Sequence, residues 1–366
     1  MNRNMNKNKI QVPNIQLFCL ERKKRPLKKE QQIIVPLSVL SSNEATICEE
    51  IEQIPYYHCF FDILHECEEL TFERVEERVF EKLDLNTDYY LFKYNNRHAV
   101  DLIDFLYSST SIKKLLLYIL DAFDHLLNGL SLLLQNGICY LNINPKNILF
   151  LGEKPLWSNF KYSLQLPTKT TDTSYSYVCD ILQCMDDFTY MPFELHLLYY
   201  VSNSNSPVIN DSESFVTESF VTESFVTEFC DEYVEKMNVL RFFSNTFKEN
   251  YKNLCVKQMM STYLHRDKEY IVRDILDRID KWDIFGFSLI YIHLFACIIH
   301  TYALKHTFLN QMLTSLLVNL HPDSSKRMTI EDTRKTFANH FDQADWTFMN
   351  HIDVHINATL FEEFAK

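Results

Sequence analysis

The side chains of this chain whose types and spacing could do chemistry gather between residues 139 and 161. Segment 139–150 reads C-Y-L-N-I-N-P-K-N-I-L-F, and a further asparagine follows at position 159. A carboxamide has no basic pKa near neutrality, so Asn142 cannot take a proton from a substrate hydroxyl. Asn147 and Asn159 offer only neutral oxygens to a hard dication, which prefers carboxylate or phosphate ligands. These positions therefore have polar groups but no acid.

The elements that would position this segment are indicated by periodicity and by capping residues. Residues 112–136 are strongly periodic in apolar side chains, which predicts an amphipathic helix, and Gly137 is well placed to end it. The apolar run 148–150 predicts a short strand, and a turn follows at residues 152–155. A long helix, a polar loop and a short strand are thus expected in succession.

This order resembles the catalytic loop of eukaryotic-type protein kinases, whose pattern is H-R-D-L-x-x-x-N followed by an apolar strand. In that alignment Tyr140 takes the His place and Asn142 takes the place of the catalytic Asp. Asn144 stands where serine/threonine kinases usually carry Lys, and Asn147 matches the metal-binding Asn. The resemblance covers residues 31–340, strongly in the second part and weakly in the first.

Three later motifs of the kinase family have counterparts in this chain. The sequence N-F-K resembles D-F-G, so that Asn159 takes the place of the Mg²⁺-holding Asp and Phe160 keeps the aromatic ring. Tyr-Met-Pro-Phe-Glu resembles A-P-E and ends at Glu194. Asp283 matches the anchoring Asp of a buried helix, and Arg327 lies in a segment resembling D-P-x-x-R-x-[ST]. The resemblance implies a structural ion pair between Arg327 and Glu194.

Most of the family's nucleotide-binding residues are missing from this sequence. The sequence V-P-L-S puts Ser38 where V-A-I-K carries the phosphate-gripping Lys, and no glycine precedes residue 129 to form a phosphate loop. A helix predicted over residues 43–54 resembles the αC helix, with Glu44 as its paired acid. Because the strand Lys is missing, we expect Glu44 to be solvated.

A strand is predicted over residues 88–94, which read D-Y-Y-L-F-K-Y. It resembles the strand that leads into the hinge between the two lobes of a kinase. Phe92 would then stand at the gatekeeper position, and Lys93 and Tyr94 would begin the hinge. These three residues, with Ser38 and Glu44, are the positions expected to face a nucleotide.

The resemblance implies an α+β, protein-kinase-like bilobal fold with a small β-rich N-lobe and a large helical C-lobe that carries a helical insert. The insert contains a low-complexity piece in which Ser-Phe-Val-Thr-Glu occurs three times, and we interpret this piece as a linker. The final segment could lie back on the domain or dock a partner. The expected divisions are a disordered basic arm over 1–30; the N-lobe over 31–94; the C-lobe over 95–340, with the insert over 200–280 and the repeat over 214–228; and an extension over 341–366.

The missing groups predict a pseudokinase, a catalytically inactive domain that serves as an interaction or allosteric module for a protein partner. No cofactor is required by this hypothesis, ATP binding stays open, and Mg²⁺ binding is disfavoured. One alternative is an active but atypical serine/threonine protein kinase that uses another acid, Asp172 or Glu153. A second alternative is a module that binds nucleotide without transferring phosphate.

Composition limits the other classes of function. The net charge is −13, and residues 1–30 hold nine Lys or Arg against two Glu, so residues 31–366 carry −13 − 7 = −20. Such an acidic body argues against a nucleic-acid-binding domain. His58, Cys59, His65 and Cys67 match no common zinc spacing.

Ten cysteines without a regular framework indicate a reducing, intracellular compartment. The polar, basic start predicts no signal peptide. The apolar run 287–304 contains His293 and His300 and is interpreted as a buried helix rather than a transmembrane segment. The bias toward Asn, Ile, Tyr, Phe and Lys is typical of AT-rich genomes, and a degenerate kinase of this composition suggests a large DNA virus, with the protein in the host cytoplasm or the virion.

Overall fold

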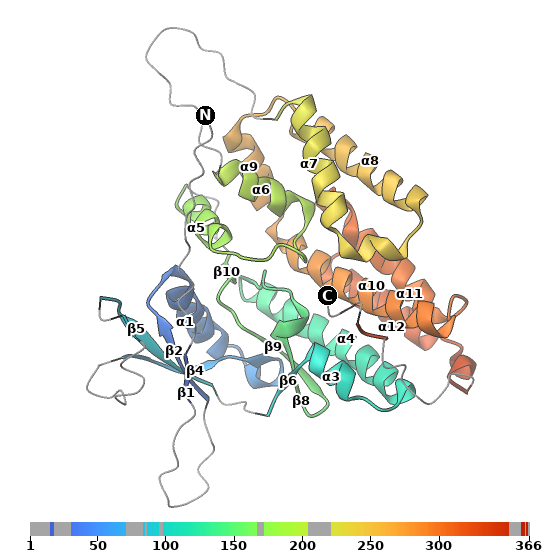
Figure 1. Cartoon of the computed structure of the whole chain (residues 1–366), viewed down its shortest axis with the longest axis horizontal. Coiled ribbons are helices and arrows are strands. Elements are labelled where there is room, and N and C mark those ends of the chain that lie inside the picture. Colours follow the sequence, from blue (N-terminus) through green and yellow to red (C-terminus); the bar gives the residue numbers. More distant parts are fainter. Residues whose placement is uncertain are drawn as a thin grey trace, which may run out of the picture.

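The computed structural model describes residues 15–17, 31–70, 83–84, 86–94, 98–166, 172–203, 221–350, 360–362 and 364. They form an α+β fold, in which a small sheet with helix α1 (Val39–Glu52) adjoins a much larger helical part (Figure 1). Apart from 15–17, the basic arm over 1–30 lies outside the described residues, as do 204–220 of the insert and most of 351–366.

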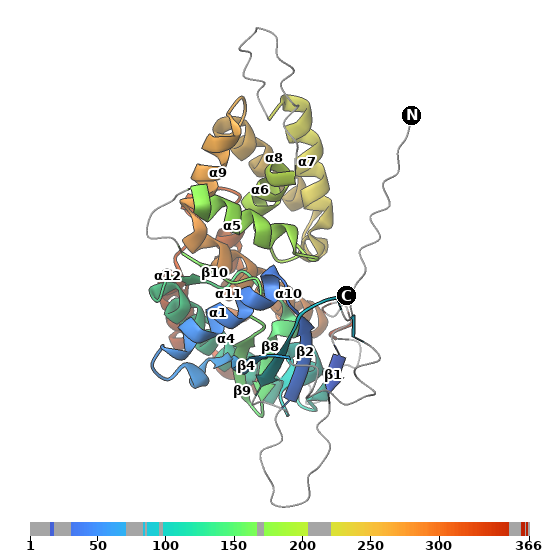
Figure 2. The ribbon, with the colours of Figure 1, turned by 90° about the vertical axis from the view of Figure 1, so that its left-hand side faces the viewer.

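The small sheet has four antiparallel strands in the order β1-β2-β5-β4. Side chains alternate between its faces, so Phe92 joins the main core beside Ile47 and Ile51 of α1, whereas Ile34 belongs to a small separate cluster. Helix α1 therefore covers one face of the sheet, and both views show it there (Figures 1 and 2). The strands are β1 (Ile15–Leu17), β2 (Gln31–Pro36), β4 (Leu64–Glu69) and β5 (Tyr89–Tyr94).

A second set of short strands frames the loop that carries the candidate site. Strands β3 (Phe61–Asp62), β9 (Lys154–Ser158), β8 (Ile148–Leu151) and β6 (Val100–Asp101) form one sheet in that order. Strands β7 (Ile138–Cys139) and β10 (Leu164–Gln165) pair antiparallel. Because β7 precedes the loop 140–147 and β10 follows the loop 159–163, this pairing brings the two loops together.

Two long helices form the core of the helical part. Helix α4 (Ile112–Gln135) follows the predicted apolar stripe, and Gly137 after it adopts φ +75°, a conformation that favours glycine. Helix α10 (Trp282–Tyr302) is buried along residues 282–299. Their aromatic side chains meet directly, with the rings of Phe123 and Phe287 5.1 Å apart. The final helices α11 (Phe308–Leu316) and α12 (Ile330–Asp342) pack around this pair, as α3 (Leu102–Ser108) does near the strands.

Two helical segments of the described chain are long and apolar enough to cross a membrane by length and composition. They are Ile112–Gln135, 56% of whose apolar window is buried within the fold, and Ile279–Tyr302, for which the share is 89%. Core helices pass the same test, and both segments pack as core helices here. This is only weak evidence against a transmembrane segment.

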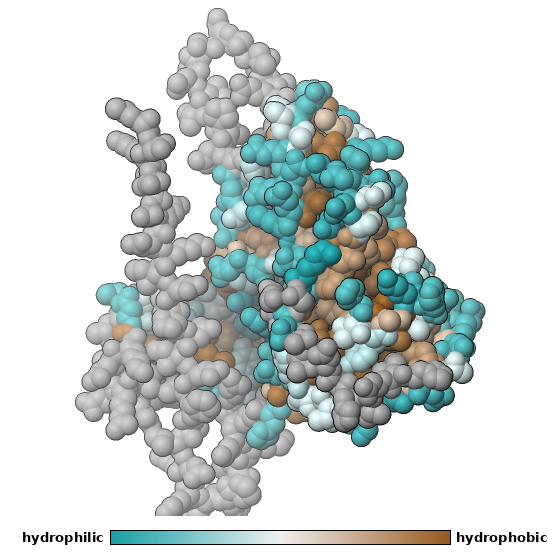
Figure 3. Space-filling view, turned by 45° about the vertical axis from the view of Figure 1, so that its right-hand side comes forward, coloured by the Kyte–Doolittle hydropathy of each residue, from teal (hydrophilic) through white to brown (hydrophobic). Residues whose placement is uncertain are grey.

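The remaining helices form the upper part of Figure 1. Helix α7 begins at Glu223, the last residue of the second Ser-Phe-Val-Thr-Glu copy, and is capped by Thr222, whose hydroxyl accepts a hydrogen bond from the N–H of Phe225. It pairs with α8 as an antiparallel hairpin. The surface of this region is largely hydrophilic with apolar areas between (Figure 3). The helices are α5 (Asp172–Gln183), α6 (Phe193–Asn203), α7 (Glu223–Lys236), α8 (Asn245–Thr262) and α9 (Lys268–Leu276).

Short 3-10 turns complete the described chain. One of them lies within the candidate loop, and another, near the C-terminal end, follows α12. The turns are η1 (Tyr57–Cys59), η3 (Pro145–Asn147), η4 (Asn238–Phe242), η5 (Ile279–Lys281), η6 (Leu317–Leu320), η7 (Ser324–Lys326) and η8 (Trp346–Asn350).

Candidate functional site

Asp283, in the first turn of α10, holds the start of the candidate loop. Its two carboxylate oxygens accept hydrogen bonds from the backbone N–H groups of Tyr140, at 2.8 Å, and Leu141, at 2.7 Å. Leu141 has φ +58°, a backbone conformation that is strained for a leucine and is fixed by these bonds. Burial raises the pKa of Asp283 to about 6, and the two backbone hydrogen bonds oppose this rise.

Three asparagines predicted as site residues meet in what we call the amide cluster: Asn142, Asn147 and Asn159. The Nδ2 group of Asn142 donates to the backbone carbonyl of Asn159. Asn147 Nδ2 donates to the carbonyl of Asn142 at 3.0 Å, and Asn159 Nδ2 donates to Asn147 Oδ1, also at 3.0 Å. Each amide of the cluster thus donates to another of its members. Asn159 itself has φ +59°.

The hydrogen bond from Asn159 to Asn147 has a direct chemical consequence. Asn147 Oδ1 is the oxygen that the kinase alignment assigns to a metal ion, and an N–H donor now points at it. A cation and an N–H donor would compete for the same lone pairs, and neutral amide oxygens are weak ligands for a hard dication. Asn147 Oδ1 therefore has a hydrogen-bond donor without a metal ion.

Tyr140 and Phe160 are structural residues beneath this cluster. Both are fully buried, and their rings contact each other at 5.3 Å between centroids. The Tyr140 hydroxyl donates to the backbone carbonyl of Ser158, and burial raises its pKa well above the usual value. Neither side chain lines the cavity beside the cluster, so both support the two loops from below.

A cavity of about 410 Å³ opens beside the amide cluster and brings charged residues to it. Lys146 and Lys161 line this cavity, and so do Asp186 and Asp187. Asp187 accepts a hydrogen bond from Asn144 Nδ2 at 3.3 Å. Sequence reasoning named Lys161 only as the last residue of N-F-K and did not single out the other three. The one available signal was the pair Asp-Asp shortly before the segment that resembles A-P-E.

Ser38 does not lie on a strand, so the prediction that it takes the place of the strand Lys is wrong. It follows β2 and caps α1, where its hydroxyl accepts from the N–H of Ser41 while Ser41 Oγ accepts from the N–H of Ser38. This reciprocal pattern is a capping box. Helix α1 consequently begins at Val39, four residues before the predicted start at residue 43.

Glu44 is buried, and the prediction of a solvated acid is wrong. It is 8% exposed, and the Tyr94 hydroxyl donates to its Oε1 at 3.2 Å. Burial raises the pKa of Glu44 to about 7, against the opposing effects of the Tyr94 hydrogen bond and the positive charge of Lys161. Its neighbour Asn43 donates to the carbonyls of Lys161 and Ser163, which ties α1 to the loop after the amide cluster.

Lys93 and Tyr94 belong to strand β5, so the prediction that they begin a hinge is wrong. Their backbones pair with β2 on one side and with β4 on the other. The Lys93 ammonium binds the carboxylates of Glu66 and Glu68, on the sheet face opposite Tyr94. Phe92 is fully buried between the sheet and α1. Residues 95–97, where a hinge would follow, lie outside the described residues.

No family model and no curated protein matches the chain.

Arg327 and Glu194 lie below the site, where the structure joins them in a buried ion pair. The other acids considered from the sequence lie elsewhere. Glu153 is in the exposed turn between β8 and β9, accepts from the Tyr118 hydroxyl and does not line the 410 Å³ cavity. Asp172 begins α5, and its side chain is outside the described part. Within the described ranges, no group of three or more His, Cys, Asp or Glu is arranged to hold a metal ion.

Proposed function

We propose that the protein is a kinase-like domain that does not transfer phosphate and acts as an interaction or allosteric module. The observation that carries this proposal is the hydrogen bond from Asn159 Nδ2 to Asn147 Oδ1. In the kinase alignment these two side chains hold the metal ions that neutralise the transferred phosphate. Here the amide of Asn159 donates to Asn147 Oδ1, so a metal ion that bound this oxygen would first have to displace that N–H group.

The position of the general base supports the same proposal. Asn142 uses its amide to bind the carbonyl of Asn159, and an amide cannot accept a proton at neutral pH. Loss of a general base typically costs about 10²–10⁴ in rate. The loss of metal ligands comes in addition, because phosphoryl transfer depends on positioning and charge neutralisation rather than on covalent help.

The space between the sheet and α1 gives a third line of support. Phe92, Tyr94 and Glu44, which the resemblance assigns to nucleotide binding, are instead packed between β5 and α1. No residue of the four-stranded sheet lines the cavity beside the amide cluster. A nucleotide bound there could contact the loops but not the strands.

Thermal unfolding with added ATP tests the proposal. A ligand that binds the folded state raises the melting temperature. Because we expect ATP and Mg²⁺ not to bind, we expect them to leave the melting temperature unchanged. The matched variant Asn142→Asp/Asn159→Asp restores both carboxylates and should gain a Mg²⁺-dependent rise. A Mg²⁺-dependent rise in the unmodified protein, together with phosphate transfer that Asn142→Ala abolishes, would refute the proposal. A rise with ATP that EDTA leaves unchanged would indicate nucleotide binding without transfer.

A second candidate function, an atypical serine/threonine kinase, is favoured by the charged residues that line the cavity. Lys161 and Asp187 could supply an ammonium group and a base from outside the usual motifs. If so, Asp187→Asn would abolish transfer from ATP and Asp186→Asn, its neighbour on the same cavity, would not. Absence of transfer in the unmodified protein under all conditions would exclude this candidate.

A further inference from the structure

The inner part of the cavity beside the amide cluster holds a cation that is only partly neutralised. Among the described residues, neither Lys146 nor Lys161 forms an ion pair. The Lys161 ammonium is half-buried and lies 4.7 Å from the centroid of the Tyr162 ring. Glu44 is the buried acid whose charge acts on Lys161, but burial raises its pKa to about 7, so near neutrality it compensates the lysine only in part. Lys161 is therefore available to bind an anionic group.

The amide cluster adds neutral donors to the same end of the cavity. Asn142, Asn147 and Asn159 all line it, and the first two are buried. A carboxamide Nδ2 group carries two N–H donors. Within the described part of the chain, each of the three uses only one of them, in the bonds that join the cluster. A second N–H of each amide remains for a ligand that accepts hydrogen bonds.

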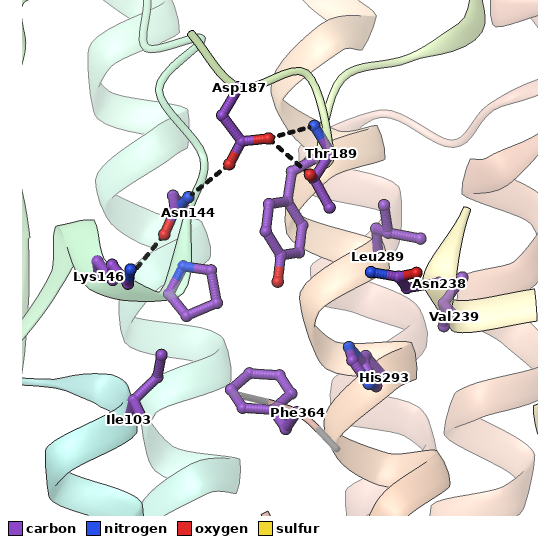
Figure 4. A pocket seen from close by; sticks show the side chains of 12 residues that line it. Ile103, Asn144, Lys146, Asp187, Thr189, Asn238, Val239, Leu289, His293 and Phe364 are labelled. Atoms are coloured by element: carbon purple, nitrogen blue, oxygen red, sulfur yellow. Dashed lines mark hydrogen bonds between the residues drawn. The ribbon is translucent and has the colours of Figure 1, made fainter. Parts of the chain in front are cut away.

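The exposed side of the cavity has the opposite charge. Asp186 and Asp187 are exposed there and outnumber one ammonium, that of Lys146. Asp187 is held in place by Asn144 Nδ2 and by the N–H and hydroxyl groups of Thr189 (Figure 4). All three donors are neutral, so the Asp187 carboxylate keeps its negative charge. The cavity is thus positive at its inner end and negative at its exposed side.

We propose that this cavity binds a small zwitterion, a molecule with an anionic group at one end and a protonated amine at the other. The anionic group binds Lys161 and the amide N–H groups, and the amine binds Asp186 and Asp187. A volume of about 410 Å³ lies within the range of small-molecule sites, roughly 300–1,000 Å³. The inference rests on the proposed function, because a metal ion at the amide cluster would compete with the ligand for that end of the cavity.

The charge pattern disfavours ligands that carry charge of one sign. A simple anion would be attracted by Lys161 but repelled by the two exposed carboxylates, and a simple cation would meet the lysine. A nucleoside triphosphate without metal has several negative charges and no amine for Asp186 and Asp187. A zwitterion complements both ends, and complementary charges are a main source of specificity in binding.

Phosphorus NMR titration of the full chain, with EDTA present, tests the inference. The probes are O-phosphoethanolamine, which has both groups, and methyl phosphate, which has the same anionic group without the amine. We expect O-phosphoethanolamine to bind about tenfold more tightly, and Lys161→Gln to weaken both probes by about tenfold, as the loss of a hydrogen bond to a charged group does. Equal affinity for the two probes, or binding that survives Lys161→Gln, would overturn the inference.

The double variant Asp186→Asn/Asp187→Asn gives a readout of opposite sign for the two probes. It should weaken O-phosphoethanolamine, because the amine loses its partners, and should strengthen methyl phosphate, because the repulsion is removed. A folding defect would weaken both probes alike, so a parallel loss would count against the proposed charge pattern. Lys335→Gln, at an exposed lysine of α12 outside the cavity, should leave both affinities unchanged.

One further probe identifies the anionic group, and the design separates this inference from the proposed function. β-Alanine carries a carboxylate in place of the phosphate, and its competition with O-phosphoethanolamine shows which group the cavity prefers. If neither zwitterion binds, the inference is wrong. The proposed function fails on a different observation, the transfer of phosphate from ATP, which these titrations do not measure.

Discussion

The guanidinium of Arg327 binds both carboxylate oxygens of Glu194, with Nη1 and Nη2 at 2.6 and 2.7 Å. The two side chains are 0% and 5% exposed, and the guanidinium also lies over the ring of Phe285. Arg327 precedes α12, and Glu194 is in the first turn of α6. The pair therefore joins the segment before α12 to the start of α6, which closely follows the cavity-lining residues Tyr190 and Met191.

Removing one partner of this pair should strongly destabilise the fold. Arg327→Met leaves the Glu194 carboxylate buried and unpaired, and we expect a loss of about 3–5 kcal/mol in the free energy of unfolding. Urea denaturation measures it. Lys326→Met is the matched control, because its ammonium pairs with Asp323 at the surface and such pairs contribute about 0–1 kcal/mol. Equal losses for the two variants would contradict the role given to the buried pair.

Asp283 should be needed for the conformation of the candidate loop. In Asp283→Asn, one backbone N–H of Tyr140 or Leu141 would face an amide NH₂ instead of an oxygen. We expect a loss of about 1.5–3 kcal/mol, the range for hydrogen bonds to a charged group, and faster amide exchange at both positions. Asp280→Asn, at a half-exposed neighbour, is the control. Unchanged exchange at residues 140 and 141 would rule out this anchoring.

The buried Glu44 should make stability depend on pH. Its pKa is raised from 4.5 to about 7 in the fold, so the folded state binds more protons than the unfolded state between these values. The free energy of unfolding should therefore fall as pH rises through this window, and level off above it. The pKa of Asp283 is likewise raised, from 3.8 to about 6. Asp283 therefore also lowers the free energy of unfolding as pH rises, in a window at lower pH.

The variant Glu44→Gln isolates this contribution. Glutamine keeps an acceptor for the Tyr94 hydroxyl and cannot ionise, so the variant should be more stable by about 1–3 kcal/mol at pH 8. It should lose the pH dependence between about pH 6 and 7 and keep the part below pH 6 that comes from Asp283. Chemical denaturation at several pH values measures both. Glu49→Gln, on the exposed face of α1, should leave the profile unchanged. A profile of Glu44→Gln identical to that of the parent would be evidence against the raised pKa.

Gly286 allows α10 to approach the candidate loop. A Cβ atom at this position would lie 2.7 Å from the backbone oxygen of Tyr190 and 2.9 Å from Ile143 Cβ. Gly286→Ala should therefore destabilise the protein by about 1–3 kcal/mol, as overpacked cores do. The sign of this change in stability is informative, because replacing glycine by alanine inside a helix otherwise stabilises a protein by about 1 kcal/mol. A higher melting temperature for Gly286→Ala would show that α10 does not pack tightly against the candidate loop.

The elements that the sequence predicts well are those encoded by local pattern. Helix α4 begins at Ile112 as its apolar stripe indicates, and it ends at Gln135, one residue before the predicted end. The apolar run 287–304 that was interpreted as a buried helix belongs to α10 as far as Tyr302, and Ala303, with φ +54°, ends the helix. The three asparagines were singled out from the resemblance to two kinase motifs, and they meet where loop 140–147 and loop 159–163 come together.

The residues that were wrongly placed depend on contacts distant in sequence. Glu44 is buried because β5 brings Tyr94, 50 residues later, against it. No periodicity in either segment encodes that meeting. The error at Ser38 has a different cause. Ser38 and Ser41, which follow a proline, are a capping signal that the sequence shows, but the alignment to V-A-I-K was preferred and placed Ser38 on a strand. Asp187 escaped notice because only the folded chain brings it to Asn144.

The cap of α7 has a consequence for how the gene can change. Thr222 caps the helix, Glu223 begins it, and Phe225 lies in its first turn, so the start of α7 spans the junction between two identical five-residue units. Copying errors that add or remove one unit would restore the same threonine, glutamate and phenylalanine at that junction. Variants with two or four units should thus inherit an unaltered helix start, and length variation at this locus would be tolerated by selection.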